Sequence, residues 1–153
     1  MKEPAMKRRI VLAAAVLAVG LAPGAARSAD APAVVAGAKV VTAEDVLKLL
    51  GAGALVVDAR IASEYSDGHI KGAVNVPYRE KSKKDVNFNA GDDDFNLTRL
   101  PSDKGAMIVI YCNGPDCWKS FKASTAAVKA GYTNVYWYRE GFPNWKAKAL
   151  PIG

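Results

Sequence analysis

Two uninterrupted apolar runs of strand length constrain the fold more than any other feature of the chain. Residues 54–57 read Ala-Leu-Val-Val and residues 107–111 read Met-Ile-Val-Ile-Tyr. A strand covered on both faces shows such a run, whereas a half-exposed strand alternates apolar and polar residues. Both runs alternate along the chain with segments of helical character. The order of elements therefore predicts an α/β fold, a parallel sheet with helices on both faces.

The other expected elements follow the same alternation. Before the second apolar run we expect strands at 40–41 and 73–76, a helix at 43–50 with a cap-like start at Thr42 and Asp45, and a helical turn at 63–65. After it we expect a helix over 118–130 ended by Gly131, a strand at 135–138 and a closing helix from Gly141.

The segment from 79 to 103 is long and polar, so a loop is expected there, with one weak helix near 95–100. Its three consecutive aspartates, residues 92–94, are expected to form a solvated surface. We do not expect a calcium site, because the sequence offers no second cluster of oxygen ligands.

The first 29 residues predict a secretory signal peptide. Basic residues near the start precede an uncharged run of 12 residues, 10–21, and small residues follow it. A membrane-spanning helix needs roughly 20 residues, so we expect cleavage after Ala26 or Ala29 and no stable membrane insertion afterwards. The expected location is periplasmic or otherwise exported.

Cleavage would change the charge of the protein. Removal of residues 1–29 takes away five of the 21 basic residues and one of the 15 acidic ones, which lowers the formal net charge from +6 to +2. Nothing then indicates a nucleic-acid partner. Residues 30–38 are small and lack a period, so we expect a mobile, flexible lead-in. A single folded domain is expected over residues 39–153.

Both cysteines lie in one short loop after the second apolar run. Cys112 ends the predicted strand, at the sheet edge where parallel sheets bind ligands. The free amides of a following helix stabilise a thiolate and lower its pKa. With Gly114 turning backbone amides inward and Lys119 adding positive charge, we predict an anion-binding bowl around the Cys112 sulfur. Two alternatives stay open: Cys112 is an inert buried residue, or it forms a structural disulfide with Cys117.

Three motifs, in this order, resemble the rhodanese family. The first is Leu-Val-Val-Asp-Ala-Arg at 55–60 with the segment 64–77, the second is Val-Ile-Tyr-Cys at 109–112, and the third runs from Gly141 to Pro151. The resemblance covers residues 39–152 and implies a single rhodanese-like domain. It implies a sulfurtransferase in which Cys112 attacks a sulfane sulfur donor such as thiosulfate, carries the sulfur as a persulfide and passes it to cyanide or a thiol. No cofactor and no metal ion are expected, because the sequence contains no phosphate-binding glycine loop and no zinc-ligand spacing.

The loop departs from the usual family pattern. The matching pair Lys119-Ser120 comes seven residues after Cys112 instead of five, and a second cysteine lies in between. This resembles a subgroup of exported rhodanese-like proteins with a Cys-Trp pair in the loop. The candidate substrate-binding residues are those of the loop and the helix start: Asn113, Gly114, Pro115, Asp116, Cys117, Trp118, Lys119 and Ser120.

Cys117 is in addition a candidate resolving thiol. It could attack the Cys112 persulfide, release sulfide and leave a disulfide, which couples the site to a thiol reductant. Three other residues are expected near the site in structural roles. Asp58 and Arg60 are expected to pair with each other and with backbone, and His69 to fix a turn.

The sequence leaves three functions to compare. The first is a sulfurtransferase with a small sulfur-containing substrate, acting with a thiol reductant or a sulfur-acceptor protein. The second is a thiol-disulfide redox protein that uses Cys112 and Cys117. The third is a non-catalytic domain that carries sulfur or binds a partner. Phosphatase chemistry is not expected, because no arginine closes the loop.

Overall fold

The computed structural model describes residues 29–153. The predicted signal peptide, apart from Ala29, lies outside the described residues. Five parallel strands form one sheet in the order β1-β5-β4-β2-β3. The strands are β1 (Ala38–Val40), β2 (Leu55–Asp58), β3 (Val74–Asn75), β4 (Met107–Tyr111) and β5 (Asn134–Tyr138).

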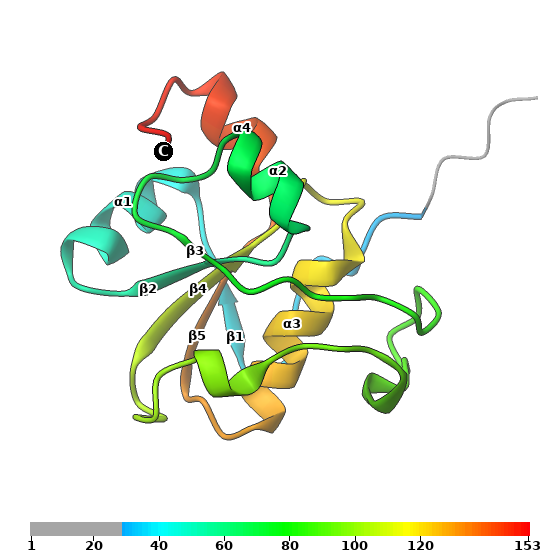
Figure 1. Ribbon diagram of the computed structural model, residues 1–153. Coiled ribbons are helices and arrows are strands. Elements are labelled where there is room, and N and C mark those ends of the chain that lie inside the picture. The colour runs from blue at the N-terminus through cyan, green and yellow to red at the C-terminus, as the bar shows by residue number, and fades with distance from the viewer. Residues whose placement is uncertain (1–28) are drawn as a thin grey trace, which may run out of the picture.

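Helices cover both faces of this sheet. Figure 1 shows α1 (Ala43–Gly51), α2 (Ala62–Asp67) and α4 (Gly141–Ala147) on one side, and α3 (Trp118–Lys129) on the other. The predicted α/β fold is therefore confirmed.

The central strand β4 shows why its sequence is apolar throughout. Val109 belongs to the core cluster formed with α1 and α4, while Ile108 and Ile110 belong to the cluster on the α3 side. Successive side chains of a strand point to opposite faces, so both faces need an apolar residue when both are covered.

Local signals fix the helix ends. The Thr42 side chain accepts a hydrogen bond from the Asp45 amide, and the Asp45 carboxylate accepts one from the Thr42 amide. This capping box starts α1 where the sequence predicts it. Helix α3 is followed by Gly131 at φ +96°, a conformation that favours glycine.

Residues 30–38, which the sequence predicts as a mobile lead-in, contain two buried side chains. Ala31 and Val35 are buried with Trp118, Phe121 and Trp137 on the α3 side of the sheet. Strand β1 then begins at Ala38, two residues earlier than predicted. We call residues 29–36 the N-terminal strap.

The long segment after β3 contains two short 3-10 helices, η1 (Ala90–Asp92) and η2 (Leu97–Arg99), the second within the predicted weak helix. The expectation of a solvated aspartate run is wrong for Asp93. Its carboxylate accepts hydrogen bonds from the Tyr78 hydroxyl, the Lys81 amide, and the Ser82 amide and hydroxyl. These bonds order the loop around one buried acid.

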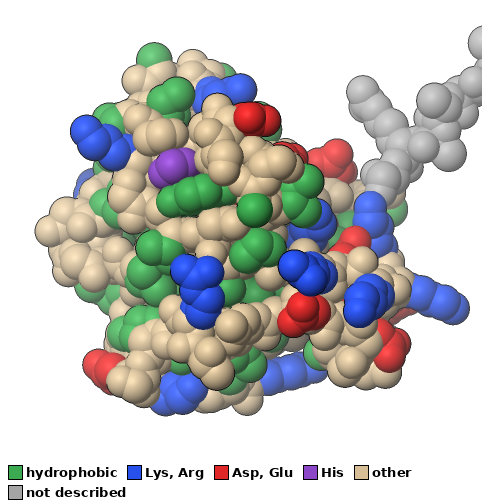
Figure 2. Space-filling view, in the orientation of Figure 1, with side chains coloured by type: hydrophobic (Ala, Val, Ile, Leu, Met, Phe, Trp, Pro, Cys, Tyr) green, Lys and Arg blue, Asp and Glu red, His purple; other side chains and the backbone are tan. Residues whose placement is uncertain are grey.

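No helix within residues 29–153 is long and apolar enough to cross a membrane. The face shown in Figure 2 carries basic and acidic side chains interspersed, without a single large basic patch.

Candidate functional site

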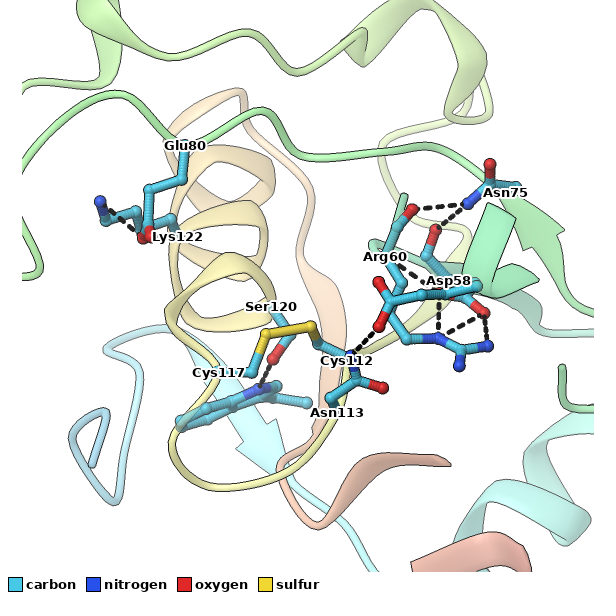
Figure 3. The surroundings of a disulfide bond; sticks show 11 residues. Asp58, Arg60, Asn75, Glu80, Cys112, Asn113, Cys117, Ser120 and Lys122 are labelled. Carbon is cyan, nitrogen blue, oxygen red and sulfur yellow. Dashed lines mark hydrogen bonds and ion pairs between the residues drawn. A yellow bond between two sulfur atoms is a disulfide. The ribbon is translucent and has the colours of Figure 1, made fainter. Parts of the chain in front are cut away.

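A disulfide occupies the centre of the predicted site. Cys112 directly follows β4, Cys117 is the N-cap of α3, and the two sulfurs are bonded across a Cα–Cα distance of 6.3 Å (Figure 3). Cys112 is 1% exposed, whereas Cys117 is half-buried. The structure thus differs from the predicted free thiolate at Cys112, because the loop folds back and brings the helix N-cap onto the strand end.

One backbone amide of the predicted bowl is already engaged within the loop. Gly114 has φ +117°, so the chain turns where glycine permits it. The Cys117 amide, however, donates to the Gly114 carbonyl over 3.0 Å. That amide is committed to closing the turn and is unavailable to a bound anion.

Helix α4 supports the loop from behind. The Phe142 amide donates to the Cys112 carbonyl over 2.9 Å. A Cβ atom on Gly141 would lie 2.3 Å from the Cys112 oxygen and 2.7 Å from the Gly114 nitrogen, and Gly141 has φ +67°. Only glycine therefore allows this close approach of two backbones.

The N-terminal strap supports the other side of the loop. The Ala31 amide donates to the Pro115 carbonyl over 2.8 Å, and the Trp118 indole N–H donates to the Ala29 carbonyl over 3.0 Å. Arg139, just after β5, donates to the carbonyls of Ala31 and Pro32. Sequence analysis missed Arg139, since neither its position nor its neighbours suggested that it would hold backbone.

The remaining substrate-binding candidates of the loop differ in exposure. The Asn113 side-chain amide donates to the Glu64 carboxylate of α2, an acid that sequence analysis did not single out. Asp116 is exposed and Lys119 is half-buried. Ser120 is buried and its hydroxyl accepts a hydrogen bond from the Trp137 indole, so its side chain faces the core, and its role in substrate binding stays a prediction.

Asp58 and Arg60 form a buried pair beside the loop. The Arg60 guanidinium lies 2.6 Å from the Asp58 carboxylate and donates to the Gly68 carbonyl over 2.7 Å. The Tyr111 hydroxyl donates to Asp58 and accepts from the Ile70 amide. Burial raises the pKa of Tyr111, and the nearby Asp58 carboxylate raises it further. These groups hold the ends of β2 and β4 together.

His69, the single histidine, lies near the surface in Figure 2. Its ring stacks on Tyr65 with centroids 3.7 Å apart, and its Nδ1 lies 2.9 Å from the Tyr65 carbonyl oxygen. Its backbone exchanges two hydrogen bonds with Gly153. All these contacts fix the turn before Ile70.

This arrangement, with a cysteine at the carboxyl end of the central parallel strand and a loop closed onto the following helix, matches a known family. Residues 42–148 match the family described as "Rhodanese-like domain". The chain belongs to this family. Membership of the subgroup with a Cys-Trp pair stays a prediction.

Named relatives of this rhodanese-like domain include a sulfurtransferase. Chloroplastic thiosulfate sulfurtransferase 16 of Arabidopsis thaliana is 34% identical over 105 residues, which are 67% of this chain and 82% of the relative. A rhodanese-like domain from Anabaena matches with a TM-score of 0.55 at 24% identity, over 74% of this chain and 76% of that one.

A thiosulfate sulfurtransferase from Pseudomonas aeruginosa also shares the fold. It matches with a TM-score of 0.54 at 23% identity, over 76% of this chain but only 20% of the longer protein. At this level of identity the likeness concerns the fold alone.

A buried cation in the rhodanese-like domain lies on α3, five residues after Cys117. The Lys122 ammonium is 2.9 Å from the Glu80 carboxylate and 3.8 Å from that of Asp93, and it donates to the Ser82 hydroxyl over 2.8 Å (Figure 3 draws Lys122 and Glu80). Burial alone would raise the pKa of Asp93, but hydrogen bonds from Ser82, Tyr78 and the Lys81 amide hold that pKa well below its usual value. Lys122 thus fastens the long loop to α3.

Within residues 29–153, no group of three or more His, Cys, Asp or Glu residues could hold a metal ion.

Proposed function

We propose that this rhodanese-like domain is a sulfurtransferase whose Cys112 carries sulfane sulfur as a persulfide once its disulfide with Cys117 has been reduced. The observation that carries the proposal is the position of Cys112, between the end of β4 and the N-terminus of α3 in a rhodanese-like domain. The name of the Arabidopsis relative supports the thiosulfate-like donor.

The reaction needs a free thiolate. After reduction, the Cys112 thiolate attacks the outer sulfur of thiosulfate, and sulfite leaves with the electron pair of the broken S–S bond. An acceptor nucleophile then attacks the outer sulfur of the persulfide and returns Cys112 to the thiolate. The amides at the N-terminus of the 12-residue helix α3 favour the negative charge on this sulfur in both forms.

The two cysteine variants test the proposal with thiosulfate as donor and cyanide as acceptor. The oxidised protein should be inactive, and treatment with a phosphine, removed before the assay, should switch activity on. Cys117→Ser should be active without reduction, because it cannot form the disulfide, whereas Cys112→Ser should be inactive in every condition. Activity that survives in a folded Cys112→Ser would rule out the proposal.

The disulfide favours a second candidate, a thiol-disulfide function of the Cys112/Cys117 pair. Bonding distance between the two sulfurs means that the Cys117 thiolate can reach Cys112. Attack on the inner sulfur of a Cys112 persulfide would release hydrosulfide and restore the disulfide. Mass spectrometry should then show that the added sulfur atom survives longer in Cys117→Ser, and equal lifetimes in the two proteins would exclude the resolving role.

Dithiol-dependent disulfide reduction that is lost with either cysteine would favour a redox protein over a sulfurtransferase. A folded domain with neither activity would favour a non-catalytic partner of another protein.

We also propose that the protein works outside the cytoplasm. A disulfide persists in oxidising compartments, and Cys112–Cys117 supports the location expected from the N-terminal sequence. The proposed partners are a small sulfur donor and a thiol reductant or sulfur-acceptor protein.

A further inference from the structure

We infer that a thiol reductant opens the disulfide by attacking the sulfur of Cys117, and that Cys112 is the leaving thiol. The inference deepens the proposed function, because it assigns the sulfur at which activation begins. It makes Cys117 the exchange residue and keeps Cys112 free to carry sulfur.

Access distinguishes the two sulfurs. Cys112 is 1% exposed, because its carbonyl is covered by the start of α4 and its strand lies in the middle of the sheet. Cys117 is half-buried and follows the exposed Asp116. An attacking thiolate must approach one sulfur from the side opposite the other. In Figure 3 the S–S bond runs from the start of α3 to the end of β4, so the line of approach to the Cys117 sulfur comes from the α3 side and the line of approach to the Cys112 sulfur from the β4 side.

The surroundings of the loop reinforce this difference. The strap covers the loop at Pro115, where the Ala31 amide is bonded, and Asn113 is held by Glu64. Both contacts immobilise the segment that would have to move to uncover Cys112. Cys117 instead occupies the N-cap of α3, and its side chain makes no capping hydrogen bond there. Reaching its sulfur therefore breaks no capping interaction.

The exchange is balanced without a further reactant. A thiolate forms a bond to the Cys117 sulfur, the Cys112–Cys117 bond breaks, and Cys112 leaves with the electron pair as a thiolate. A second thiol then attacks the reductant's sulfur in the mixed disulfide and releases Cys117. The reductant is oxidised to its disulfide, and the protein gains two thiols. The leaving thiolate lies at the N-terminus of α3, which favours its charge and its departure.

Charged side chains next to Cys117 should affect which thiols react fastest. Asp116 is exposed and directly precedes Cys117. Its carboxylate repels an anionic thiol, whereas Lys119 two residues after Cys117 attracts one, so removing the Asp116 charge should speed the reaction with an anionic thiol.

The direct test locates the first mixed disulfide on the oxidised wild-type protein. Limiting glutathione is added, the reaction is quenched with acid at short times, and free thiols are alkylated with a maleimide. Cleavage on the N-terminal side of Asp116 separates Cys112 from Cys117 for mass spectrometry. At the shortest times, we expect glutathione on Cys117 and maleimide on Cys112, with the opposite pattern lower by about tenfold or more, since access decides which sulfur is attacked.

Glutathione chiefly on Cys112, or equally on both cysteines at the shortest times, would overturn the inference. This measurement uses no sulfur donor. The inference about Cys117 can therefore fail while sulfur transfer by Cys112 is confirmed, and it can hold while sulfur transfer by Cys112 fails.

A charge variant supplies a second measurement. Asp116→Asn should accelerate the glutathione reaction about two- to threefold at low salt, as expected for one unit charge several ångströms away in water. The matched variant Asp92→Asn, which removes an exposed acid from the distant 3-10 helix η1, should leave the rate unchanged. Equal rates for the two variants would count against attack beside Asp116.

Discussion

Gly141 shows how one residue without a side chain shapes the loop that holds Cys112. Its hypothetical Cβ would overlap the Cys112 carbonyl oxygen at 2.3 Å, and its φ of +67° disfavours any other residue. Gly141→Ala should therefore destabilise the protein by at least about 1–2 kcal/mol from the backbone conformation alone, with a further loss from the contact. Urea unfolding of the oxidised protein measures the loss.

Gly51→Ala provides the matched control for Gly141. Gly51 is the last residue of α1, and nothing lies within 4 Å of a Cβ placed there. Alanine at a helix end should be neutral or stabilise by up to about 1 kcal/mol. If Gly141→Ala proved as stable as Gly51→Ala, the close approach of α4 to the loop would be wrong.

The Asp93 carboxyl should make the stability of the domain depend on pH in the acid range. Its pKa in the folded protein is held below the usual value of 3.8 by the hydrogen bonds from Ser82, Tyr78 and Lys81. As the pH falls, the unfolded chain therefore takes up the Asp93 proton at a higher pH than the folded protein does. The free energy of unfolding should then fall as the pH drops below about 4. Asp93→Asn should be less stable than wild type at neutral pH, but its stability should fall less steeply in this range.

Unfolding by urea at a series of pH values tests this expectation for Asp93. Asp92→Asn, one residue earlier and exposed, should retain the wild-type slope. An unchanged slope in Asp93→Asn would show that the acid loss comes from other carboxylates.

Helix α3 and the loop over residues 79–96 are joined by the buried ammonium of Lys122. Its side chain is fully buried between Glu80 and Asp93, whose side chains are 13% and 1% exposed. Lys122→Met should cost about 3–5 kcal/mol of unfolding free energy, because it leaves these carboxylates without their cation. Lys129→Met, on the exposed end of the same helix, should cost less than about 1 kcal/mol. Chemical denaturation of both proteins gives the comparison, and similar losses would contradict the clamping role of Lys122.

Elements with a repeating pattern could be predicted from the sequence, and irregular segments could not. The apolar run of β4 and the capping box of α1 each specify a local structure that packing then preserves. The strap and Asp93 follow no period. Which of three adjacent aspartates turns inward depends on donors that the fold brings from Tyr78 and Ser82, and no local rule encodes that choice.

At the scale of the whole molecule, the position of the candidate site was predictable while its chemical state was not. Parallel strands gather their carboxyl ends at one edge, so the sequence already places Cys112 there. Whether Cys112 is a thiolate or bonded to Cys117 depends on how the loop closes between α4 and the strap. The contacts of Gly141, Ala31 and Arg139 that close it come from segments distant in the sequence.

The molecule as a whole joins a rhodanese-like domain to a disulfide that includes Cys112, the cysteine that we propose carries sulfur. Under this proposal, the same loop takes part first in thiol exchange and then in sulfur transfer. Reduction must precede loading, since the Cys112 sulfur cannot bond to a donor while it is bonded to Cys117.

The central claim is tested most directly by locating added sulfur on the intact protein after exposure to thiosulfate. The oxidised and the phosphine-reduced protein are treated in parallel and cleaved on the N-terminal side of Asp116. Mass spectrometry under conditions that preserve persulfides then gives the masses of the two cysteine peptides. We predict one extra sulfur atom on the peptide with Cys112, in the reduced sample only. Extra sulfur on the Cys117 peptide instead, or loading of the oxidised protein to the same extent, would contradict it.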